Sequence, residues 1–279
     1  MAGIVSTIGQ KCRRCFSCIR ECPATAIRVV NGQAFVITER CLSCGHCVKV
    51  CSQHAKEISS DIEKVLFKLI PKGKTVAMVA PSFAASFPND YLKLPSALKS
   101  MGFIKVTEAA FGADLISPLY GKLFEKIDGR TIISSPCPAI YNYIEKYFTE
   151  LVPNLAPIVS PMIAMGRYLK ETLGNDIKVV FIGPCVAKKS EYIDEEVNDA
   201  VDAVLTFTEL KKIFNDNNID ISSFNEIEFD PPYANLGKSF PLTGGLLKTA
   251  KISGDILAKK VIVVDGKEKV EEIIQDVWN

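Results

Sequence analysis

Two evenly spaced runs of four cysteines near the start of the chain constrain it more than any other feature. Each run has the pattern C-x2-C-x2-C-x3-C, and every cysteine of the first recurs 29 residues later in the second. The first run is Cys12, Cys15, Cys18 and Cys22, and the second is Cys41, Cys44, Cys47 and Cys51. Three thiolates at this spacing hold one 4Fe–4S cubane, while the fourth serves the neighbouring cluster. The spacing therefore predicts two clusters, one bound by Cys12, Cys15, Cys18 and Cys51 and the other by Cys41, Cys44, Cys47 and Cys22.

Zinc sites and disulfides are the alternative uses for so many cysteines. Four-thiolate zinc sites usually have their ligand pairs separated by a longer loop, which disfavours zinc. A disulfide framework is typical of secreted proteins, and residues 1–10 have neither the basic patch nor the apolar core of a signal peptide. No stretch approaches the ~18 uninterrupted apolar residues of a membrane span. We therefore expect a cytoplasmic protein with no membrane partner.

Length and charge narrow the class further. The 279 residues suggest about two domains, and a hydrophobic content of 48% suffices for a large core. The 33 basic and 32 acidic residues give a net charge of +1. Nucleic acid and anionic membranes are therefore not expected partners.

Residues 1–56 are predicted to form a small α+β ferredoxin-like module. Asn31-Gly32 separates two short β-rich stretches between the cysteine runs, and this dipeptide favours a two-residue hairpin turn. So short a segment cannot build a good apolar core, and we expect the clusters to hold it together.

Residues 57–73 are predicted to be a connecting helix. Ser60-Asp61 is a suitable N-terminal cap, and Pro71 and Gly73 are expected to end the helix. Ile62, Val65, Leu66 and Leu69 would then lie on one apolar face.

From Lys74 onwards, short apolar runs alternate with amphipathic stretches, which predicts an α/β core with mostly parallel sheets. The expected strands are Thr75–Ala80, Lys105–Ala109, Thr131–Ser134, Lys178–Ile182, Ala203–Thr206 and Lys260–Val264. The expected helices include Ser96–Met101, Ile140–Thr149, Pro161–Leu173 and Thr208–Asp216. Pro153 and Pro157 suggest a division into two lobes, residues 74–152 and 153–279. A ligand is expected between the lobes, beyond the carboxyl ends of the strands.

The two remaining cysteines, Cys137 and Cys185, each follow a predicted strand in a Pro-Cys turn. A thiol that opens a helix lies near backbone N–H groups, which favour the thiolate and lower its pKa. A lone free cysteine is usually a small buried hydrophobe. Two in matched turns behind a cluster-binding module favour metal ligation instead.

The motifs around these two cysteines resemble those of the iron-only (diiron, FeFe) hydrogenase family. The family motif T-S-C-C-P is matched by residues 134–138, which read S-S-P-C-P, and its motif M-P-C-x-x-K-x-x-E by residues 183–191, which read G-P-C-V-A-K-K-S-E. Further similar segments are 80–82, 111–115, 204–210 and 243–246. The resemblance covers nearly the whole chain and implies a dicluster ferredoxin-like module followed by a two-lobed hydrogenase core.

The resemblance also implies roles for individual residues. Cys137 and Cys185 match ligands of a 4Fe–4S cluster that is bridged to a diiron unit. Lys188 matches the lysine that donates to an iron-bound cyanide, and Glu191 matches a glutamate on the proton path. The segment Ala80-Pro81-Ser82 matches the one that lies against the diiron unit. The implied chemistry is heterolytic splitting or formation of dihydrogen, with electrons exchanged with a ferredoxin-type or other carrier.

Several positions depart from the family pattern. Pro136 replaces a proton-shuttling cysteine, Gly183 replaces a methionine, and Ile140 replaces an aromatic residue. No cysteine follows Cys185, so two of the four active-site thiolates of the family are missing. We expect either a divergent hydrogenase or hydrogen sensor whose final segment lies beyond this chain, or a degenerate relative that only transfers electrons or senses redox state. In the first case the chain alone would be inactive, and its parent protein could carry a C-terminal sensory or signalling region.

Overall fold

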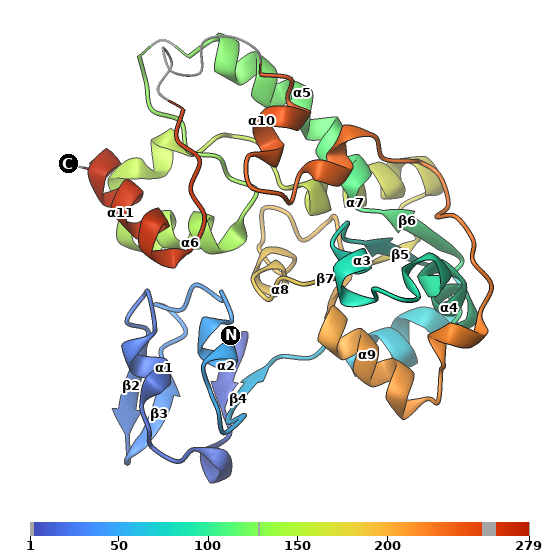
Figure 1. Cartoon of the computed structure of the whole chain (residues 1–279), viewed down its shortest axis with the longest axis horizontal. Coiled ribbons are helices and arrows are strands. Elements are labelled where there is room, and N and C mark those ends of the chain that lie inside the picture. Colours follow the sequence, from blue (N-terminus) through green and yellow to red (C-terminus); the bar gives the residue numbers. More distant parts are fainter. Residues whose placement is uncertain (1–2, 128, 253–260, 279) are drawn as a thin grey trace.

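The computed structural model describes residues 3–127, 129–252 and 261–278. Opposite ends of the folded molecule contain different kinds of structure (Figure 1). A small module of short strands and helices lies at one end, and a parallel sheet flanked by helices lies at the other. Helices α6 (Pro138–Tyr147) and α11 (Lys267–Trp278) lie beside the module. The first and last described parts of the chain are therefore neighbours.

The module contains two antiparallel strand pairs. They are β1 (Val5–Thr7) with β4 (Lys56–Ile58), and β2 (Ile27–Val30) with β3 (Gln33–Val36). Val30 pairs with Gln33, so Asn31-Gly32 forms a two-residue turn with φ angles of 49° and 76°. Both turn positions of a type I′ hairpin need positive φ, which asparagine and glycine tolerate. The predicted hairpin is thus confirmed.

The two halves of the module have matching backbone conformations, offset by 29 residues. Helix α1 (Ser17–Arg20) corresponds in this way to α2 (His46–Lys49). Positive φ angles recur at the matched pairs Arg14 and Ser43, Phe16 and Gly45, and Thr25 and His54. Non-glycine residues seldom adopt positive φ, so this recurrence shows that the cysteine repeat is also a structural repeat.

A short helical connector leads from the module to the sheet. The Ser60 hydroxyl accepts a hydrogen bond from the Ile62 N–H (3.3 Å), as expected for a residue that begins a helix. The segment is π-helical over Lys64–Leu69 and then a 3-10 turn over Ile70–Lys72, and Gly73 ends it with a φ of 68°.

Four parallel strands form the main sheet, in the order β6-β5-β7-β8. They are β5 (Thr75–Val79), β6 (Lys105–Glu108), β7 (Lys178–Gly183) and β8 (Ala203–Thr206). Every residue of β5 and β8 is buried, as is usual for parallel strands covered on both faces. The predicted α/β class is confirmed. Each predicted lobe supplies two strands to this one sheet, so the sheet does not separate the lobes. The lobe boundaries therefore stay a prediction.

Two predicted strands are wrong. Residues 131–134 make only one isolated bridge, between Ile133 and Leu155, because the chain turns through Pro136 and Pro138 into α6 and these prolines lack backbone donors. Residues 261–264 pair with no strand of the described chain, since their apolar side chains at Ile262 and Val263 face outward. Lys260 lies outside the described residues.

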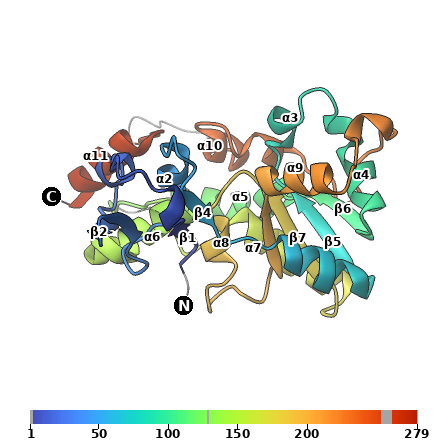
Figure 2. The ribbon, with the colours of Figure 1, turned by 90° about the horizontal axis from the view of Figure 1, so that it is seen from below.

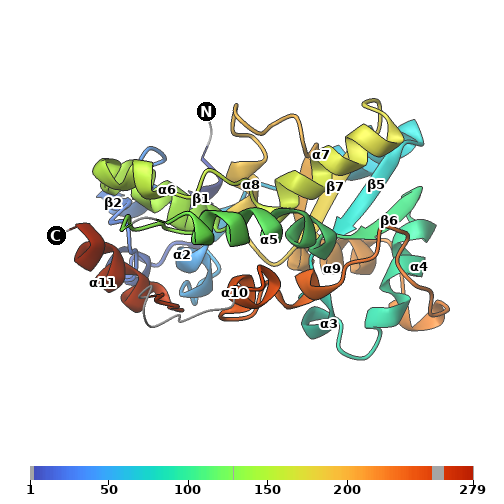
Figure 3. The same ribbon diagram turned by 90° about the horizontal axis from the view of Figure 1, so that it is seen from above.

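Helices cover both faces of the sheet (Figures 2 and 3). Besides α6 and α11, the α-helices after the connector are α3 (Phe83–Ser86), α4 (Leu94–Ser100), α5 (Ala110–Glu125), α7 (Pro161–Leu173), α8 (Lys188–Glu191), α9 (Phe207–Asp216) and α10 (Gly245–Thr249). Helices α4 and α9 lie on one face and α7 on the other, with α5 alongside α7. The four helices predicted from sequence are confirmed, with ends displaced by two residues at most. In the described ranges, no helix is long and apolar enough to cross a membrane.

Candidate metal centres

The eight cysteines of the module surround two separate cavities, four around each. One cavity is lined by Cys12, Cys15, Cys18 and Cys51. The other is lined by Cys22, Cys41, Cys44 and Cys47. The fourth thiol of each sequence run thus joins the first three of the other run, which is the grouping that the spacing predicts. We call the first set the outer cradle and the second the inner cradle.

Backbone N–H groups already point at the thiol sulfurs. The Ala26 N–H donates to Cys22 Sγ and the Ala55 N–H to Cys51 Sγ, both at 3.3 Å and again 29 residues apart. Such donors stabilise thiolates and help to set the reduction potential of a bound cluster. The donor chemistry and the arrangement of four thiols around one cavity fit a cubane at each position.

The two cradles differ in their electrostatics. Hydrogen bonds from the Ala34 and Arg14 backbones lower the pKa of Cys12, and hydrogen bonds from the Ser17 N–H and hydroxyl lower that of the exposed Cys15. Burial instead raises the pKa of Cys47 in the inner cradle to about 12.

Burial likewise raises the pKa of Cys41 in the inner cradle and that of Cys18 in the outer cradle. A buried thiol of this kind ionises only when a cation is bound beside it. The inner cradle therefore depends most on iron for its thiolates.

Cys137 and Cys185 both lie where a chain turn meets a helix. Cys137 is the N-terminal cap of α6, and Pro138 occupies the first helical position. Cys185 follows β7, and a negative charge on Cys137 is among the influences that raise its pKa, so the two thiols are near one another. The expected lowering of the Cys185 pKa is wrong, because burial outweighs the nearby Lys188 ammonium and the N–H groups of Ala187 and Lys188.

Lys188 is buried and links the two cysteine loops. Its ammonium donates to the Glu191 carboxylate (2.6 Å) and to the Pro136 carbonyl oxygen (3.4 Å), next to Cys137. Only 9% of Lys188 is exposed, so this helical turn is not a solvated one. Lys188 and Glu191 therefore face the space beside the two thiols as an ion pair.

The segment Ala80-Pro81-Ser82 lies at the same edge of the sheet. It follows β5, and the Ala80 N–H donates to the Ile182 carbonyl oxygen (2.8 Å) on β7. A side chain added at Gly183 would come within 3.0 Å of Ala80 Cβ. The order β6-β5-β7-β8 places the point where strand order reverses between β5 and β7, the usual ligand position in such sheets.

The inner cradle lies directly against this second site. Gly45, between Cys44 and His46, has a φ of 75°, and a Cβ built on it would lie 2.9 Å from Val186. Val186 is the neighbour of Cys185, so glycine lets the two loops touch. Asn142 of α6 strengthens the contact, since its side-chain amide donates to the Leu42 carbonyl and the Ser190 hydroxyl, both at 3.3 Å.

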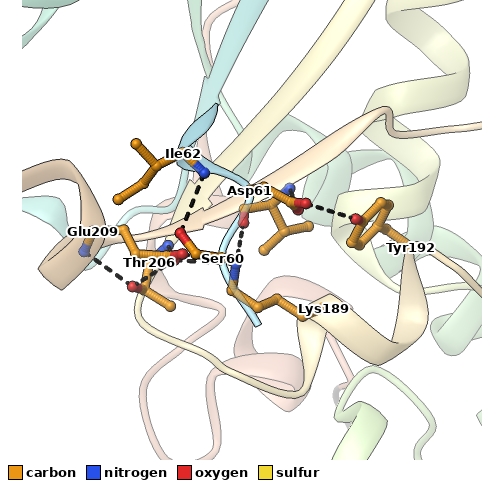
Figure 4. Close-up of polar contacts among 8 residues, drawn as sticks. Ser60, Asp61, Ile62, Lys189, Tyr192, Thr206 and Glu209 are labelled. Atoms are coloured by element: carbon orange, nitrogen blue, oxygen red, sulfur yellow. Dashed lines mark hydrogen bonds and ion pairs between the residues drawn. The ribbon is translucent and has the colours of Figure 1, made fainter. Parts of the chain in front are cut away.

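A buried polar network beside α8 was not found from the sequence (Figure 4). Lys189, of which 1% is exposed, donates to the Val204 carbonyl oxygen (2.6 Å) and to Glu209 (3.1 Å). Asp61 of the connector accepts from the Val204 N–H and the Tyr192 hydroxyl, each at 3.0 Å. Val204 lies on the edge strand β8, so both of its outward backbone groups are satisfied.

One detail of the network could have been inferred from the sequence. Thr206 and Glu209 form a capping box at the start of α9, and the T-x-x-E spacing of this device is visible in the sequence. Burial and the Asp61 carboxylate raise the pKa of Tyr192, so its hydroxyl keeps its proton. The network fixes the connector and α8, and hence Cys185, to one edge of the sheet.

Comparison with known proteins identifies the family. A family model described as "Iron only hydrogenase large subunit, C-terminal domain" matches residues 73–277, and a "4Fe-4S dicluster domain" model matches residues 4–52. Iron hydrogenase 1 of Clostridium pasteurianum is 30% identical over 226 residues, covering 71% of this chain and 39% of that protein. The chain thus spans about two fifths of that relative.

Two further matches are a solved hydrogenase structure and a cluster assembly factor. A variant of the FeFe-hydrogenase HydA1 from Chlamydomonas reinhardtii superposes with a TM-score of 0.56 and 26% identity, covering 68% of this chain and 56% of that one. A cytosolic Fe-S cluster assembly factor NAR1 homolog of Schizosaccharomyces japonicus is 34% identical over 106 residues, or 34% of this chain and 20% of that protein. The chain therefore belongs to the iron-only hydrogenase family, as a divergent iron–sulfur member with an N-terminal dicluster module.

Proposed function

We propose that the chain holds one 4Fe–4S cluster in each cradle and passes electrons between an external carrier and a further iron centre at Cys137 and Cys185. The contact of Gly45 with Val186 carries this proposal, because it places the inner cradle against the loop of Cys185. Cys15 and Cys44 are the exposed thiols of the two cradles, but Gly45, next to Cys44, is in contact with Val186, so the outer cradle is the one open to a carrier. Electrons would therefore enter at the outer cradle and leave through the inner one.

The clusters would supply one-electron transfer, and the protein residues control access and charge. Burial of Cys47 shields part of the inner cradle from water. Lys188 brings a fixed positive charge to within hydrogen-bond distance of the Pro136 carbonyl, so it can stabilise an anionic group held between the two loops. Glu191 keeps that ammonium in place and is the nearest carboxylate to it.

A non-catalytic role in electron transfer or redox sensing is the second candidate. Two observations favour it. Pro136 has no ionisable group at the position where the family pattern has a cysteine, and Lys188 is already paired with Glu191. Part of this chain is also similar to a protein named for a role other than hydrogen turnover, a cytosolic Fe-S cluster assembly factor.

Iron and sulfide analysis after anaerobic reconstitution tests the proposal. Two cubanes predict about eight irons and eight sulfides per chain, and Cys47→Ala should lose about four of each. Cys185→Ala should keep those eight and lose only iron in excess of them. Colourless protein that contains two zinc ions and no sulfide would contradict both candidate functions.

Hydrogen-dependent dye reduction separates the two candidates. The parent protein, with the segment that follows this chain restored and matured in a host that assembles diiron centres, should reduce the dye if the centre at Cys137 and Cys185 is catalytic. Reversible reduction of the two clusters without hydrogen turnover would instead support electron transfer or sensing.

A further inference from the structure

Residues 13–16 and 42–45, near the start of each cysteine run, form the same backbone face, but the two faces have different surroundings. Three positions of that face differ in kind between the repeats: Arg13, Arg14 and Phe16 in the first correspond to Leu42, Ser43 and Gly45 in the second. Because the φ angles of the two segments match, these residues occupy equivalent places on the repeated scaffold. The difference between them therefore reflects what each face contacts.

In the second repeat this face packs against the rest of the chain. Leu42 and Ser43 are buried, with 5% and 6% exposed. Leu42 accepts a hydrogen bond from Asn142 of α6, and Gly45 touches Val186. The scaffold thus uses this face to place the inner cradle against its electron partner.

In the first repeat the same face is exposed and basic. Arg13 and Arg14 are exposed, in contrast to Leu42 and Ser43, whereas Cys15 and its counterpart Cys44 are exposed alike. Arg20 lies across the rim of the outer cradle, where its guanidinium donates to the Cys15 carbonyl oxygen (3.2 Å). We call Arg13, Arg14, Cys15 and Arg20 the arginine face.

Few acidic groups oppose this charge. Residues 11–28 contain five basic side chains and one acidic one, Glu21, although the whole chain has a net charge of only +1. Glu21 is itself neutralised, since Lys267 of α11 lies 3.0 Å from its carboxylate. In Figure 1, β2, β3 and α1 lie on the side of the module away from the parallel sheet. Arg14 lies against the Gly32 turn that joins β2 to β3, so the arginine face projects positive charge from that side of the module.

We propose that the arginine face is the docking site of an acidic electron-carrier protein, whose carboxylates surround its redox group. This inference rests on the proposed function. An acidic partner is favoured because complementary charge at an interface rim steers encounter and orients the partner. The exposed Cys15 would then bring the outer cradle within reach of the carrier, as Gly45 brings the inner cradle to the loop of Cys185.

Charge reversal tests the proposal. The rate constant for reduction by a reduced plant-type 2Fe–2S ferredoxin of net negative charge is measured for the wild type and for Arg13→Glu/Arg14→Glu. Steering of this kind changes association rates by 10- to 1000-fold, so we expect the double variant to be about 10- to 100-fold slower at low ionic strength. Added salt should slow the wild type steeply and the variant little.

Lys68→Glu/Lys72→Glu is the matched control, since it makes the same change in net charge at exposed positions of the connector. It should react with the ferredoxin at nearly the wild-type rate. A basic c-type cytochrome used as oxidant should respond in the opposite way and gain rate in Arg13→Glu/Arg14→Glu. If the reversed charges disturb cluster assembly, Arg13→Gln/Arg14→Gln replaces the glutamate variant. It should lose less rate with ferredoxin, because it removes the positive charges without adding negative ones.

Two controls distinguish failure of the docking site from failure of the proposed function. They are the iron content and the rate of reduction by photoreduced deazaflavin, a small neutral reductant. With about eight irons present and normal deazaflavin rates, equal ferredoxin rates for the arginine and lysine variants would overturn the docking site and leave the proposed function intact. Wild-type protein without clusters, or clusters that deazaflavin cannot reduce, would overturn both.

Discussion

The cysteine module and the sheet-containing core are held together by different means. The module buries only a small set of apolar residues, among them Val5, Ile27, Ala34 and Val36, and its apolar cluster includes Cys18 and Cys47 themselves. In the core, the four strands, the connector and the helices α4, α7 and α9 contribute buried residues to one large apolar cluster around β5 and β7. The core can therefore fold on apolar burial, whereas the module needs another source of stability.

This difference predicts which perturbation each region responds to. In small metal-binding domains the binding free energy of the metal is also folding free energy. The inner cradle supports this, since burial raises the pKa of Cys47 to about 12, and such a thiol ionises only beside a bound cation. Iron should thus control the module, and packing and ion pairs should control the core.

Removal of iron should have the largest effect and would break the comparison if it failed. Chelation under anaerobic, denaturant-free conditions is expected to unfold residues 3–58 and leave the sheet intact. Limited proteolysis should then cut the module roughly tenfold faster or more, while a core fragment beginning near the connector persists. Restored iron and sulfide should restore protection, and a module that stays protected without iron would contradict the comparison.

The Lys189 pair should show the next largest effect, confined to the core. Lys189→Met leaves the Glu209 carboxylate, of which 13% is exposed, without its cation. Breaking a buried ion pair from one side costs about 3 kcal/mol of unfolding free energy, measured here by urea denaturation. The iron content should not change, because none of the module cysteines contacts this pair in the hydrogen bonds and ion pairs of the described chain.

Two further variants sharpen that measurement. Lys212→Met, at an exposed position of α9, should cost less than about 0.5 kcal/mol. Lys189→Met/Glu209→Gln should recover part of the loss, since the amide can still cap α9 without carrying an unpaired charge. Equal stability of Lys189→Met and Lys212→Met would show that the buried pair contributes nothing.

Features set by neighbours in sequence could be predicted, and those set by distant neighbours could not. The Asn31-Gly32 turn, the crossed grouping of the cysteines and four of the six expected strands follow from local pattern and spacing. Even the crossed grouping of the cysteines depends on sequence neighbours only. The spacing within one run directs its fourth thiol to the neighbouring cluster, and the second run has the same spacing.

The missed network joins residues that are far apart in the chain. Asp61 meets Val204 across 143 positions, and nothing near either residue in sequence announces the contact. Lys189 follows Lys188 in a turn that resembles a solvated one, and only the fold shows that both are buried. The false strand at 131–134 has the opposite cause, since its apolar pattern is real but its neighbour Leu155 offers only one bridge.

The smallest expected effect is a pH dependence that belongs to the core alone. Burial, the largest influence on Asp202, raises its pKa, but hydrogen bonds from Lys178 (2.8 Å), the Val179 N–H (3.0 Å) and Lys170 together hold it below the usual 3.8. A carboxyl with a lowered folded pKa stabilises the fold above its unfolded value and loses that contribution as pH falls through the folded value. Asp202→Asn should therefore cost about 1–2 kcal/mol near neutral pH.

The difference between wild type and Asp202→Asn should stay constant above about pH 5 and shrink below about pH 4, as both proteins come to carry an uncharged group there. Acid loss of the clusters is common to both proteins and cancels in the comparison. Asp199→Asn is the control, because the Asp199 side chain is 59% exposed and exposed pairs contribute about 0–1 kcal/mol. A difference that persists unchanged to pH 3 would mean that Asp202 acts through shape and not charge. Buried charge would then stabilise the core at the Lys189–Glu209 pair but not at Asp202.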